Sequence, residues 1–485
     1  MTLRSDPAPV TVLCAIIVRV FDYLTQVPYP TQFNSEQTPA MLEWFAASRG
    51  EHPAQTCGQY ADLGSGPGVT VTAVAALNVD TLCTGYDVNP EHQVSLMNLA
   101  SDVGLDNVQA RCTDFAALLA DDDFSPDIAT ARGVLSWIPP VAREQLAQLF
   151  GRVGPGGLVS LGFDTLPGQA ALAPLHDLAR TLRRDAEDQA GSSGFIGILN
   201  QIVESRSPYL LSSPTTRQQL RSILSLGEDY VMHDLGVPEW RAFWVDEVVE
   251  MLAPHGLRYV GSVAGDDQTM PWIAPELAKI VESAPDIASA VRVQELLLNP
   301  SFRSIVFRRA PTCPAEIDLK GGSLNPEVVP KVGWVVPPTS IDWKRNLPQL
   351  GVDGEATEAL TPSTPGVTDM RRIPELLGST ADIPVGVWST VLIGSGYVQP
   401  LRDQAVADRS RPACQRFNRV AVSRSNRSDD VAALVAPDSG AGVQLGRTLS
   451  AAIAARRDGS DHMESDRLSE SLSWWSQTLG IETGL

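Results

Sequence analysis

The sequence contains few basic residues and very little lysine. Its 37 lysines and arginines face 57 aspartates and glutamates, so the formal net charge is −20, and only four of the basic residues are lysines. Such a charge repels polyanions, which argues against broad binding of nucleic acid or of anionic membranes.

Cysteine and histidine are also scarce and widely spaced. There are six of each, with no C-x-x-C pair and no H-E-x-x-H motif, so neither a zinc site nor a disulfide framework is expected. The apolar run over residues 10–20 is shorter than the roughly 20 residues that a membrane span needs. We therefore expect a reduced, cytoplasmic protein with no bound metal and no membrane partner.

The length and apolar content are those of a folded chain with several domains. The chain has 485 residues, 43% of them hydrophobic, which suggests two or three domains. Strand-like and helix-like segments alternate between residues 58 and 163, which predicts a parallel sheet with right-handed crossovers, an α/β doubly wound fold. The expected strands are 60–63, 81–86, 108–112, 127–131 and 158–163, and the expected helices are 69–77, 90–103 and 141–150.

The remainder of the chain divides by composition. Residues 170–219 are rich in helix signals, and 245–252, 256–263 and 304–309 predict one more helix and two more strands. Prolines and glycines become dense between 325 and 384, as in linkers. We expect a catalytic core over 20–168, a helical insertion and regulatory segment over 169–310, a linker over 311–368 and a smaller C-terminal domain over 369–485.

A glycine-rich turn follows the first expected strand and indicates a ligand site. The segment reads Asp-Leu-Gly-Ser-Gly-Pro-Gly from Asp62 to Gly68. A dinucleotide fingerprint would need glycine at Val69, and the lysine of a phosphate loop is absent, so both of those sites are excluded. A carboxylate at Asp62 instead suits a ligand that carries an ammonium or a sulfonium group.

Acidic residues also close the second and third expected strands. Asp87 is placed to accept hydrogen bonds from ribose hydroxyls, and Asp114 with Phe115 is placed to hold and cover an adenine ring. A nucleoside with a cationic tail describes S-adenosylmethionine, the expected cofactor. The alternative for each motif alone is an ordinary turn or a helix N-cap. The predicted cofactor-binding residues are Asp62, Gly64, Gly66, Gly68, Asp87, Val88, Asp114, Phe115 and Gly133.

On these motifs the sequence resembles the class I S-adenosylmethionine-dependent methyltransferases, and more closely the methyltransferase regulatory domain family with its rickettsial-type protein-lysine methyltransferases. The closer match rests on residues 28–30 (Pro-Tyr-Pro), 133–137 (Gly-Val-Leu-Ser-Trp), 154–168, 230–244 and 252–262. The resemblance implies methyl transfer to a protein lysine, a homodimer, and a winged-helix-like C-terminal domain.

The sequence departs from this family on the side of the expected methyl acceptor. Arg132, Leu135, Asp164 and Gln169 stand where relatives usually have other residues. Asp164 is a candidate catalytic residue that would take a proton from the acceptor or hold it, with a helix N-cap or turn residue as the alternative. Tyr29 is the second candidate, as a lid over the cofactor or as packing of its own turn.

Other polar and aromatic residues have structural interpretations that we prefer. Arg132 is expected to pair with the acidic residues 121–123, Trp137 to pack against the sheet, and Trp240 and Trp244 to share a helical face in the core. His233 and Asp234 are candidates for a general base pair, but sequence neighbours are not expected to face the same way, so a structural role is preferred. The arginines between 409 and 427 are expected to be solvated or paired within the chain, rather than to bind nucleic acid.

Two alternatives to a protein methyltransferase remain open from the sequence. One is a regulatory protein that binds the cofactor but has lost its acceptor site, and the altered acceptor side motivates it. The other is a methyltransferase of a glycan or a small molecule. The size of the chain and its extra domains favour a bulky acceptor, most simply a protein side chain.

Overall fold

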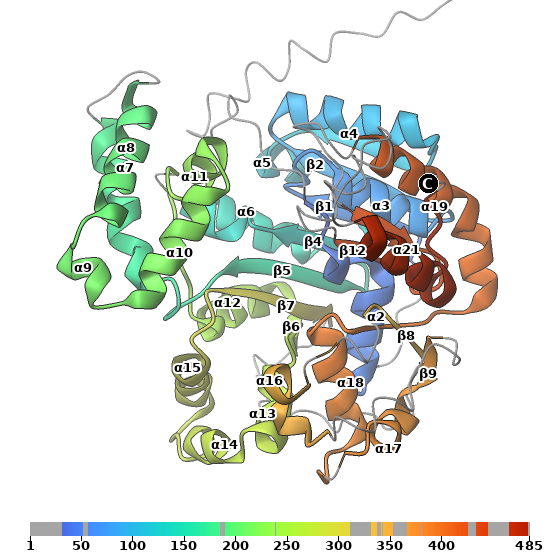
Figure 1. Cartoon of the computed structure of the whole chain (residues 1–485). Helices are drawn as coiled ribbons and strands as arrows, with labels where there is room; N and C mark the ends of the chain where they lie inside the picture. Colours follow the sequence, from blue (N-terminus) through green and yellow to red (C-terminus); the bar gives the residue numbers. More distant parts are fainter. Residues whose placement is uncertain are drawn as a thin grey trace, which may run out of the picture.

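The computed structural model describes residues 32–51, 57–184, 190–237, 239–310, 331–336, 341, 343–352, 366–379, 381–424, 433–444 and 465–483. Its centre is a seven-stranded sheet with the order β3-β2-β1-β4-β5-β7-β6 (Figure 1). The first five strands are parallel, and β7 is antiparallel to both β5 and β6. The strands are β1 Gln59–Leu63, β2 Leu82–Asp87, β3 Val108–Cys112, β4 Ile128–Arg132, β5 Leu158–Asp164, β6 Leu257–Ser262 and β7 Phe302–Arg309.

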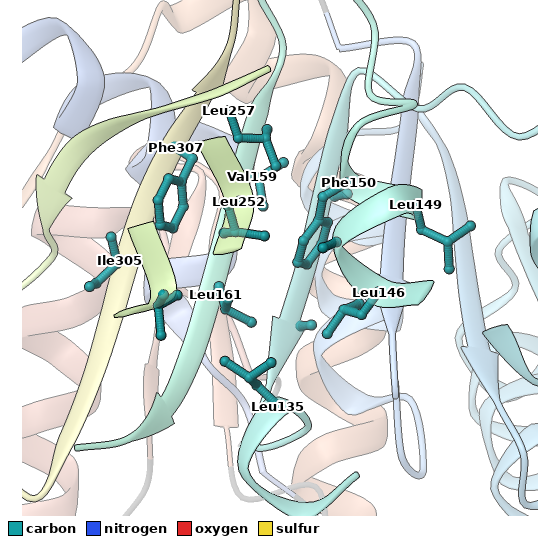
Figure 2. Close-up of a cluster of buried hydrophobic side chains, with 14 of the residues drawn as sticks. Leu135, Leu146, Leu149, Phe150, Val159, Leu161, Leu252, Leu257, Ile305 and Phe307 are labelled. Atoms are coloured by element: carbon teal, nitrogen blue, oxygen red, sulfur yellow. The ribbon is translucent and has the colours of Figure 1, made fainter. Parts of the chain in front are cut away.

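Helices cover both faces of the sheet, as a doubly wound fold requires. One face carries a core of α5, α6 and α12 side chains, and Figure 2 shows Leu146 and Phe150 of α6 in this core with Leu161 of β5 and Phe307 of β7. The other face packs against α2, α3 and α4. These helices are α2 Pro39–Ser48, α3 Val69–Leu77, α4 Pro90–Val103, α5 Phe115–Leu119, α6 Pro140–Phe150 and α12 Val245–Leu252. The predicted α/β doubly wound class is confirmed.

Local chemistry explains why several elements begin and end where the sequence predicts. The Asn89 side chain accepts a hydrogen bond from the Glu91 N–H and caps α4, whose other end is closed by Gly104 in the left-handed conformation. All seven residues of β5 are buried, as expected for an inner strand with both faces covered. The structure therefore places α3, α4 and β3 at their predicted bounds.

The predicted helical insertion leaves the sheet after β5 and has a core of its own. The helices α7 to α11 pack around buried side chains that include Leu175, Leu199, Leu220 and Leu235. Three further helices lie between β6 and β7. The bounds are α7 Ala173–Arg184, α8 Ala190–Glu204, α9 Pro208–Leu211, α10 Pro214–Ser225, α11 Glu228–Asp234, α13 Asp266–Ile273, α14 Pro275–Glu282 and α15 Ile287–Leu298.

The C-terminal part contains two small sheets. The strands β10, β8 and β9 form an antiparallel sheet, and β11 pairs with β12. The strand β8 lies within the segment expected as a linker, and the winged-helix-like character of this part stays a prediction. The elements are β8 Lys331–Trp334, α16 Trp343–Asn346, β9 Val367–Asp369, α17 Ile373–Leu376, α18 Val385–Gly394, β10 Val398–Pro400, α19 Gln404–Arg424, β11 Ala433–Ala436, β12 Ala441–Gln444 and α21 Ser465–Leu479.

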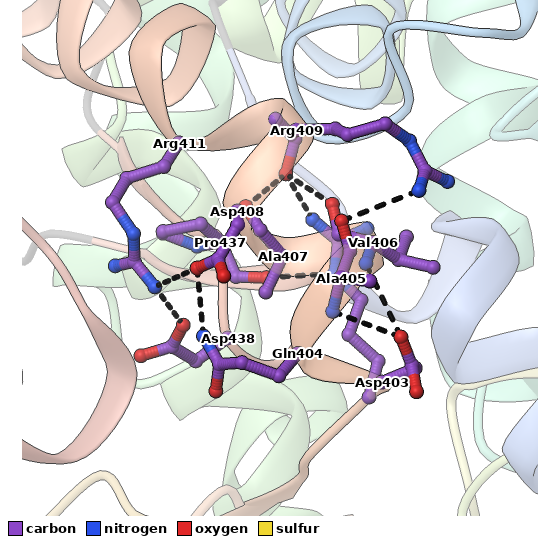
Figure 3. Close-up of polar contacts among 12 residues, drawn as sticks. Asp403, Gln404, Ala405, Val406, Ala407, Asp408, Arg409, Arg411, Pro437 and Asp438 are labelled. Carbon is purple, nitrogen blue, oxygen red and sulfur yellow. Dashed lines mark hydrogen bonds and ion pairs between the residues drawn. The ribbon is translucent and has the colours of Figure 1, made fainter.

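The arginine-rich helix α19 lies against α3 and α4, at their C-terminal ends (Figure 1). Arg416 donates from Nε to the Val103 carbonyl at 2.8 Å, and just before α19 Arg402 donates to the carbonyl that ends α3 at the same distance. Helix C-termini attract cations, so these contacts are favourable. Near the start of α19, Arg411 pairs with Asp408 and Asp438 (Figure 3). The expected pairing of these arginines within the chain is therefore seen for several of them.

We expect Phe417→Ala in α19 to lower the free energy of unfolding by about 3–5 kcal/mol, the usual cost of truncating a buried phenylalanine. Phe417 is 1% exposed and joins the core between α19 and α3. Arg419→Ala, on the exposed side of the same helix, should change stability by less than about 0.5 kcal/mol. Equal effects of the two variants in urea-unfolding experiments would show that α19 is not docked as described.

Among the helices of the described segments, none combines the length and the apolar character that a membrane crossing requires. Of the cysteines in the described segments, Cys57, Cys83 and Cys414 are free.

Candidate active site

Two adjoining cavities open at the carboxyl ends of the parallel strands. The large cavity has a volume of about 710 Å³ and lies between the glycine-rich turn, the end of β5 and the insertion helices α10 and α11. The small cavity, of about 400 Å³, lies over the ends of β2 and β3. Gly64, Gly66, Arg132, Gly133 and Trp137 line both cavities, so one ligand can extend from one into the other.

The glycine-rich turn between β1 and α3 tolerates no side chain at two of its positions. Gly64 has a φ of +83°, and a Cβ atom there would lie 2.4 Å from the Val134 side chain. Gly68 has a φ of +82° and is the N-cap residue of α3. A Cβ atom on Gly68 would lie 2.5 Å from the Leu96 side chain. Both positions therefore need glycine for conformation and for space.

Asp87 at the end of β2 holds this turn in place. Its Oδ2 atom accepts a hydrogen bond from the Gly66 N–H at 2.9 Å, and its Oδ1 atom accepts one from the Asn89 N–H at 2.8 Å. Each carboxylate oxygen has a second lone pair, so Asp87 still has capacity to accept hydrogen bonds from ligand hydroxyls.

Asp62 at the end of β1 is buried beneath the turn. Its Oδ1 atom accepts a hydrogen bond from the Thr130 hydroxyl at 2.8 Å. Burial raises the pKa of Asp62 to about 7, a rise that the Thr130 bond reduces and the charge of Asp87 increases. A cationic ligand group beside Asp62 would favour its ionised form.

The small cavity is closed by the residues that follow β2 and β3. Asp114 caps α5 by accepting a hydrogen bond from the Ala117 N–H at 2.7 Å, while Val88 and Phe115 supply apolar walls. All nine residues predicted to bind the cofactor line one or both cavities, and their individual roles stay predictions. They are Asp62, Gly64, Gly66, Gly68, Asp87, Val88, Asp114, Phe115 and Gly133.

Asp164 lies across the large cavity at the end of β5 and is 5% exposed. Its Oδ2 atom accepts a hydrogen bond from the Trp240 indole at 2.7 Å, and Oδ1 accepts one from the Gln169 amide at 3.1 Å. Desolvation raises its pKa to about 6 although both bonds lower it. The alternative of a helix N-cap is wrong, because these side chains and not helix N–H groups hold the carboxylate.

A second buried carboxyl group lies in the same cavity. Burial raises the pKa of Asp234 to about 7, and the negative charge of Asp164 adds to the rise. His233 and Asp234 both line the large cavity, and the expectation that their side chains face different ways stays a prediction. Trp137 lines both cavities and its indole N–H donates to the Asp234 backbone carbonyl at 3.2 Å, while its expected packing against the sheet stays a prediction.

Trp240 is held in place by an unforeseen partner from the insertion. Its ring stacks on His176 of α7 with the centroids 3.6 Å apart and an angle of 4° between the planes. Burial lowers the pKa of His176 to about 3, so the imidazole is neutral. Trp240 precedes α12 and Trp244 is its N-cap, so the prediction of a shared helical face is wrong. No spacing in the sequence signals the contact of His176 with Trp240.

Arg132 pairs with a different residue from the one expected. Its Nη1 atom lies 2.6 Å from the Glu36 carboxylate and donates to the Ser304 hydroxyl at 2.7 Å. Asp121 instead pairs with Arg111 at 2.7 Å. The other candidate catalytic residue, Tyr29, lies outside the described residues.

Comparison with known proteins identifies the segment that runs from α11, the last insertion helix, to the end of β7. Residues 227–309 match the family model described as the predicted methyltransferase regulatory domain. The chain carries a methyltransferase regulatory domain. Trp240 and β7 both belong to this domain, so it contributes directly to the site around Asp164.

Solved structures resemble this chain over most of its length. PKMT2 from Rickettsia typhi has a TM-score of 0.59 at 15% identity over 92% of this chain and 92% of that one. The same protein in complex with AdoHcy has a TM-score of 0.58 at 15% identity, over 88% of this chain and 87% of that one. At such identity the likeness shows the fold, which is that of the class I methyltransferases.

Curated relatives are similar over different parts of the chain. The uncharacterized protein sll1526 of Synechocystis is 25% identical over 442 residues, covering 88% of this chain and 85% of its own. Trans-aconitate 2-methyltransferase of Methylobacterium radiotolerans is 29% identical over 195 residues, covering 39% of this chain and 67% of its own. The resemblance found in the sequence is thus confirmed.

The cleft also suits the expected donor, S-adenosylmethionine. The buried carboxyl group of Asp62 lies beside a glycine-rich turn whose backbone a ligand can approach closely, because no side chains project from its glycines.

Proposed function

We propose that this chain transfers a methyl group from S-adenosylmethionine to an amine of a bulky acceptor, most simply the lysine side chain of a protein. The observation that carries the proposal is the pair of buried carboxyl groups, Asp164 and Asp234, in the cavity next to the glycine-rich turn. Carboxyl groups in such a place attract a cationic amine and can take its proton.

The residues of the turn have the chemistry to bind the donor. When bound, S-adenosylmethionine supplies a methyl group that its positive sulfur makes electrophilic. Asp62 pairs with the ammonium group of the donor, and Asp87 accepts hydrogen bonds from the ribose hydroxyls. Asp114 and Phe115 hold the adenine in the small cavity.

The acceptor side must deliver an uncharged amine in line with the methyl group. A lysine has a free pKa of about 10.4, and burial lowers it while the same burial raises the pKa of Asp164. The two pKa values move toward each other, so Asp164 takes a proton from the ammonium group first, and the lone pair that this leaves on nitrogen then forms the bond to the methyl carbon. The bond between carbon and sulfur breaks, and its electron pair stays on sulfur. Trp240 and Gln169 hold Asp164 in position for this step.

The experiment that tests the proposal follows a labelled methyl group. The full chain is incubated with methyl-labelled S-adenosylmethionine and a fractionated bacterial lysate. We expect label in protein that stays bound in mild alkali, because methylamines are stable there whereas methyl esters hydrolyse. Label that alkali releases would indicate a carboxylate acceptor, and label in small molecules alone would also contradict the proposal.

We expect donor binding to weaken as the pH falls below about 7. Asp62 has its pKa raised to about 7 in the free protein, and the donor's ammonium group lowers this pKa in the complex. Affinity is therefore full above pH 7 and decreases by up to tenfold per unit below it. Calorimetry with S-adenosylhomocysteine measures this change, and 5′-methylthioadenosine, which has no ammonium group, serves as the control. An equal pH dependence for both ligands would contradict the role of Asp62.

A further inference from the structure

The large cavity has a polar corner, formed by Gln37 and Arg132, that the roles described above do not use. Gln37 is the last residue of the short helix η1 (Ser35–Gln37), and Arg132 ends β4. Glu36 connects them, because it precedes Gln37 in the chain and its carboxylate lies 2.6 Å from Arg132. Gln37 and Arg132 line the large cavity together with the glycine-rich turn.

We propose that this corner, the carboxylate corner of Gln37 and Arg132, binds the carboxylate of the donor's amino-acid tail. The inference rests on the proposed function, because it concerns how the same donor is held. Neither residue was among the predicted cofactor-binding residues.

Gln37 has a buried donor group that lacks a partner. The residue is 2% exposed, and its Nε2 atom makes no hydrogen bond within the described part of the chain. A buried amide N–H without a partner is destabilising, and native structures rarely contain one. A ligand oxygen in the adjoining cavity would satisfy this donor.

Arg132 has donors to spare in the same corner. Both of its polar contacts, to Glu36 and to Ser304, use the Nη1 atom, and its guanidinium group stacks over the Phe302 ring at 4.5 Å. Nε and Nη2 have no hydrogen-bond partner among the described residues, and the side chain is 25% exposed. The planar arrangement of guanidinium donors matches a carboxylate.

The acidic residues around the cavities would repel the donor's carboxylate, so a positive group is needed beside it. Asp62, Asp164 and Asp234 line the large cavity, and Arg132 is the one lysine or arginine among the described residues that line either cavity. The donor's ammonium and carboxylate groups are attached to the same carbon atom, so a carboxylate lies close to Asp62 when the ammonium is paired. The positive end of α3, which begins at this corner, adds to the attraction.

The test compares S-adenosylmethionine with decarboxylated S-adenosylmethionine, which differs from it by the carboxylate alone. Calorimetry on the full chain gives the affinity ratio of the two ligands for the wild type and for Arg132→Gln, Gln37→Leu and the charge-neutral pair Glu36→Gln with Arg132→Gln. Arg180→Gln, which changes an arginine on α7 whose side chain is 42% exposed, is the control for losing one positive charge. Thermal unfolding verifies that each variant is folded.

We expect the wild type to prefer the carboxylated ligand by about 10- to 100-fold, the range for hydrogen bonds to a charged group. The ratio should fall toward one in Arg132→Gln and in the charge-neutral pair, fall partly in Gln37→Leu, and stay unchanged in Arg180→Gln. A wild-type ratio in all variants, or equal weakening of both ligands, would overturn the carboxylate corner. A wild-type chain that binds neither ligand would instead refute the proposed function.

Discussion

The Asp164→Asn variant is expected to transfer methyl groups about 100- to 10,000-fold more slowly than the wild type, the usual effect of removing a general base. The asparagine oxygen can still accept from Trp240, and Gln169 can rotate its amide because its Oε1 atom is buried without a partner. The fold and the donor affinity should therefore remain. In the wild type, the rate should fall as the pH drops below about 6, where Asp164 becomes protonated.

The measurement for Asp164 is single-turnover transfer from labelled donor, together with donor affinity by calorimetry. Asp177→Asn is a matched control, since this aspartate lies on the exposed side of α7 and pairs only locally with Arg180. A rate within about threefold of the wild type, at unchanged donor affinity, would show that Asp164 has a structural role.

Replacement of Asp87 by alanine should lower the affinity for S-adenosylhomocysteine by at least about 100-fold. The variant loses two hydrogen bonds from ribose to a charged acceptor, each worth about 1.5–3 kcal/mol. It also releases the Gly66 and Asn89 N–H groups that shape the turn and the start of α4. Asp87→Asn keeps one acceptor oxygen, so its affinity for S-adenosylhomocysteine should lie between those of Asp87→Ala and the wild type.

Calorimetry measures the loss of affinity for S-adenosylhomocysteine in the Asp87 variants. Asp80→Ala removes an aspartate shortly before β2 that is 75% exposed and pairs with Arg409, so it should bind the donor like the wild type. If Asp87→Ala retained wild-type affinity for S-adenosylhomocysteine, Asp87 would not hold the ribose, and its assigned role in donor binding would be refuted.

The donor half of the site was predictable because it depends on where the strands end. Parallel strands bring their carboxyl ends to one edge of a sheet, so acidic residues that close β1, β2 and β3 must lie close together. Asp62, Asp87 and Asp114 follow this rule, and each is placed by the strand or helix cap next to it in the sequence. The helix bounds were predictable for the same reason, since caps such as Asn89 and Gly104 are local.

The acceptor half was not predictable, because its contacts join segments far apart in the sequence. Asp164 receives a hydrogen bond from Trp240, 76 residues away, and Trp240 stacks on His176 of the insertion. The expected pairing of Arg132 with the acidic loop failed for a geometric reason. That loop precedes β4 and Arg132 ends it, so a five-residue strand puts the two at opposite edges of the sheet.

The sequence by itself determined the doubly wound sheet, the glycine-rich turn and the acids at the strand ends, because hydrophobic periodicity, caps and turn glycines act over a few residues. Only the tertiary structure decided the environment of Asp164, the pairing of Arg132 with Glu36 and the unpaired amide of Gln37. These depend on which surfaces pack together, and burial then sets pKa values and hydrogen-bond needs that no local pattern encodes.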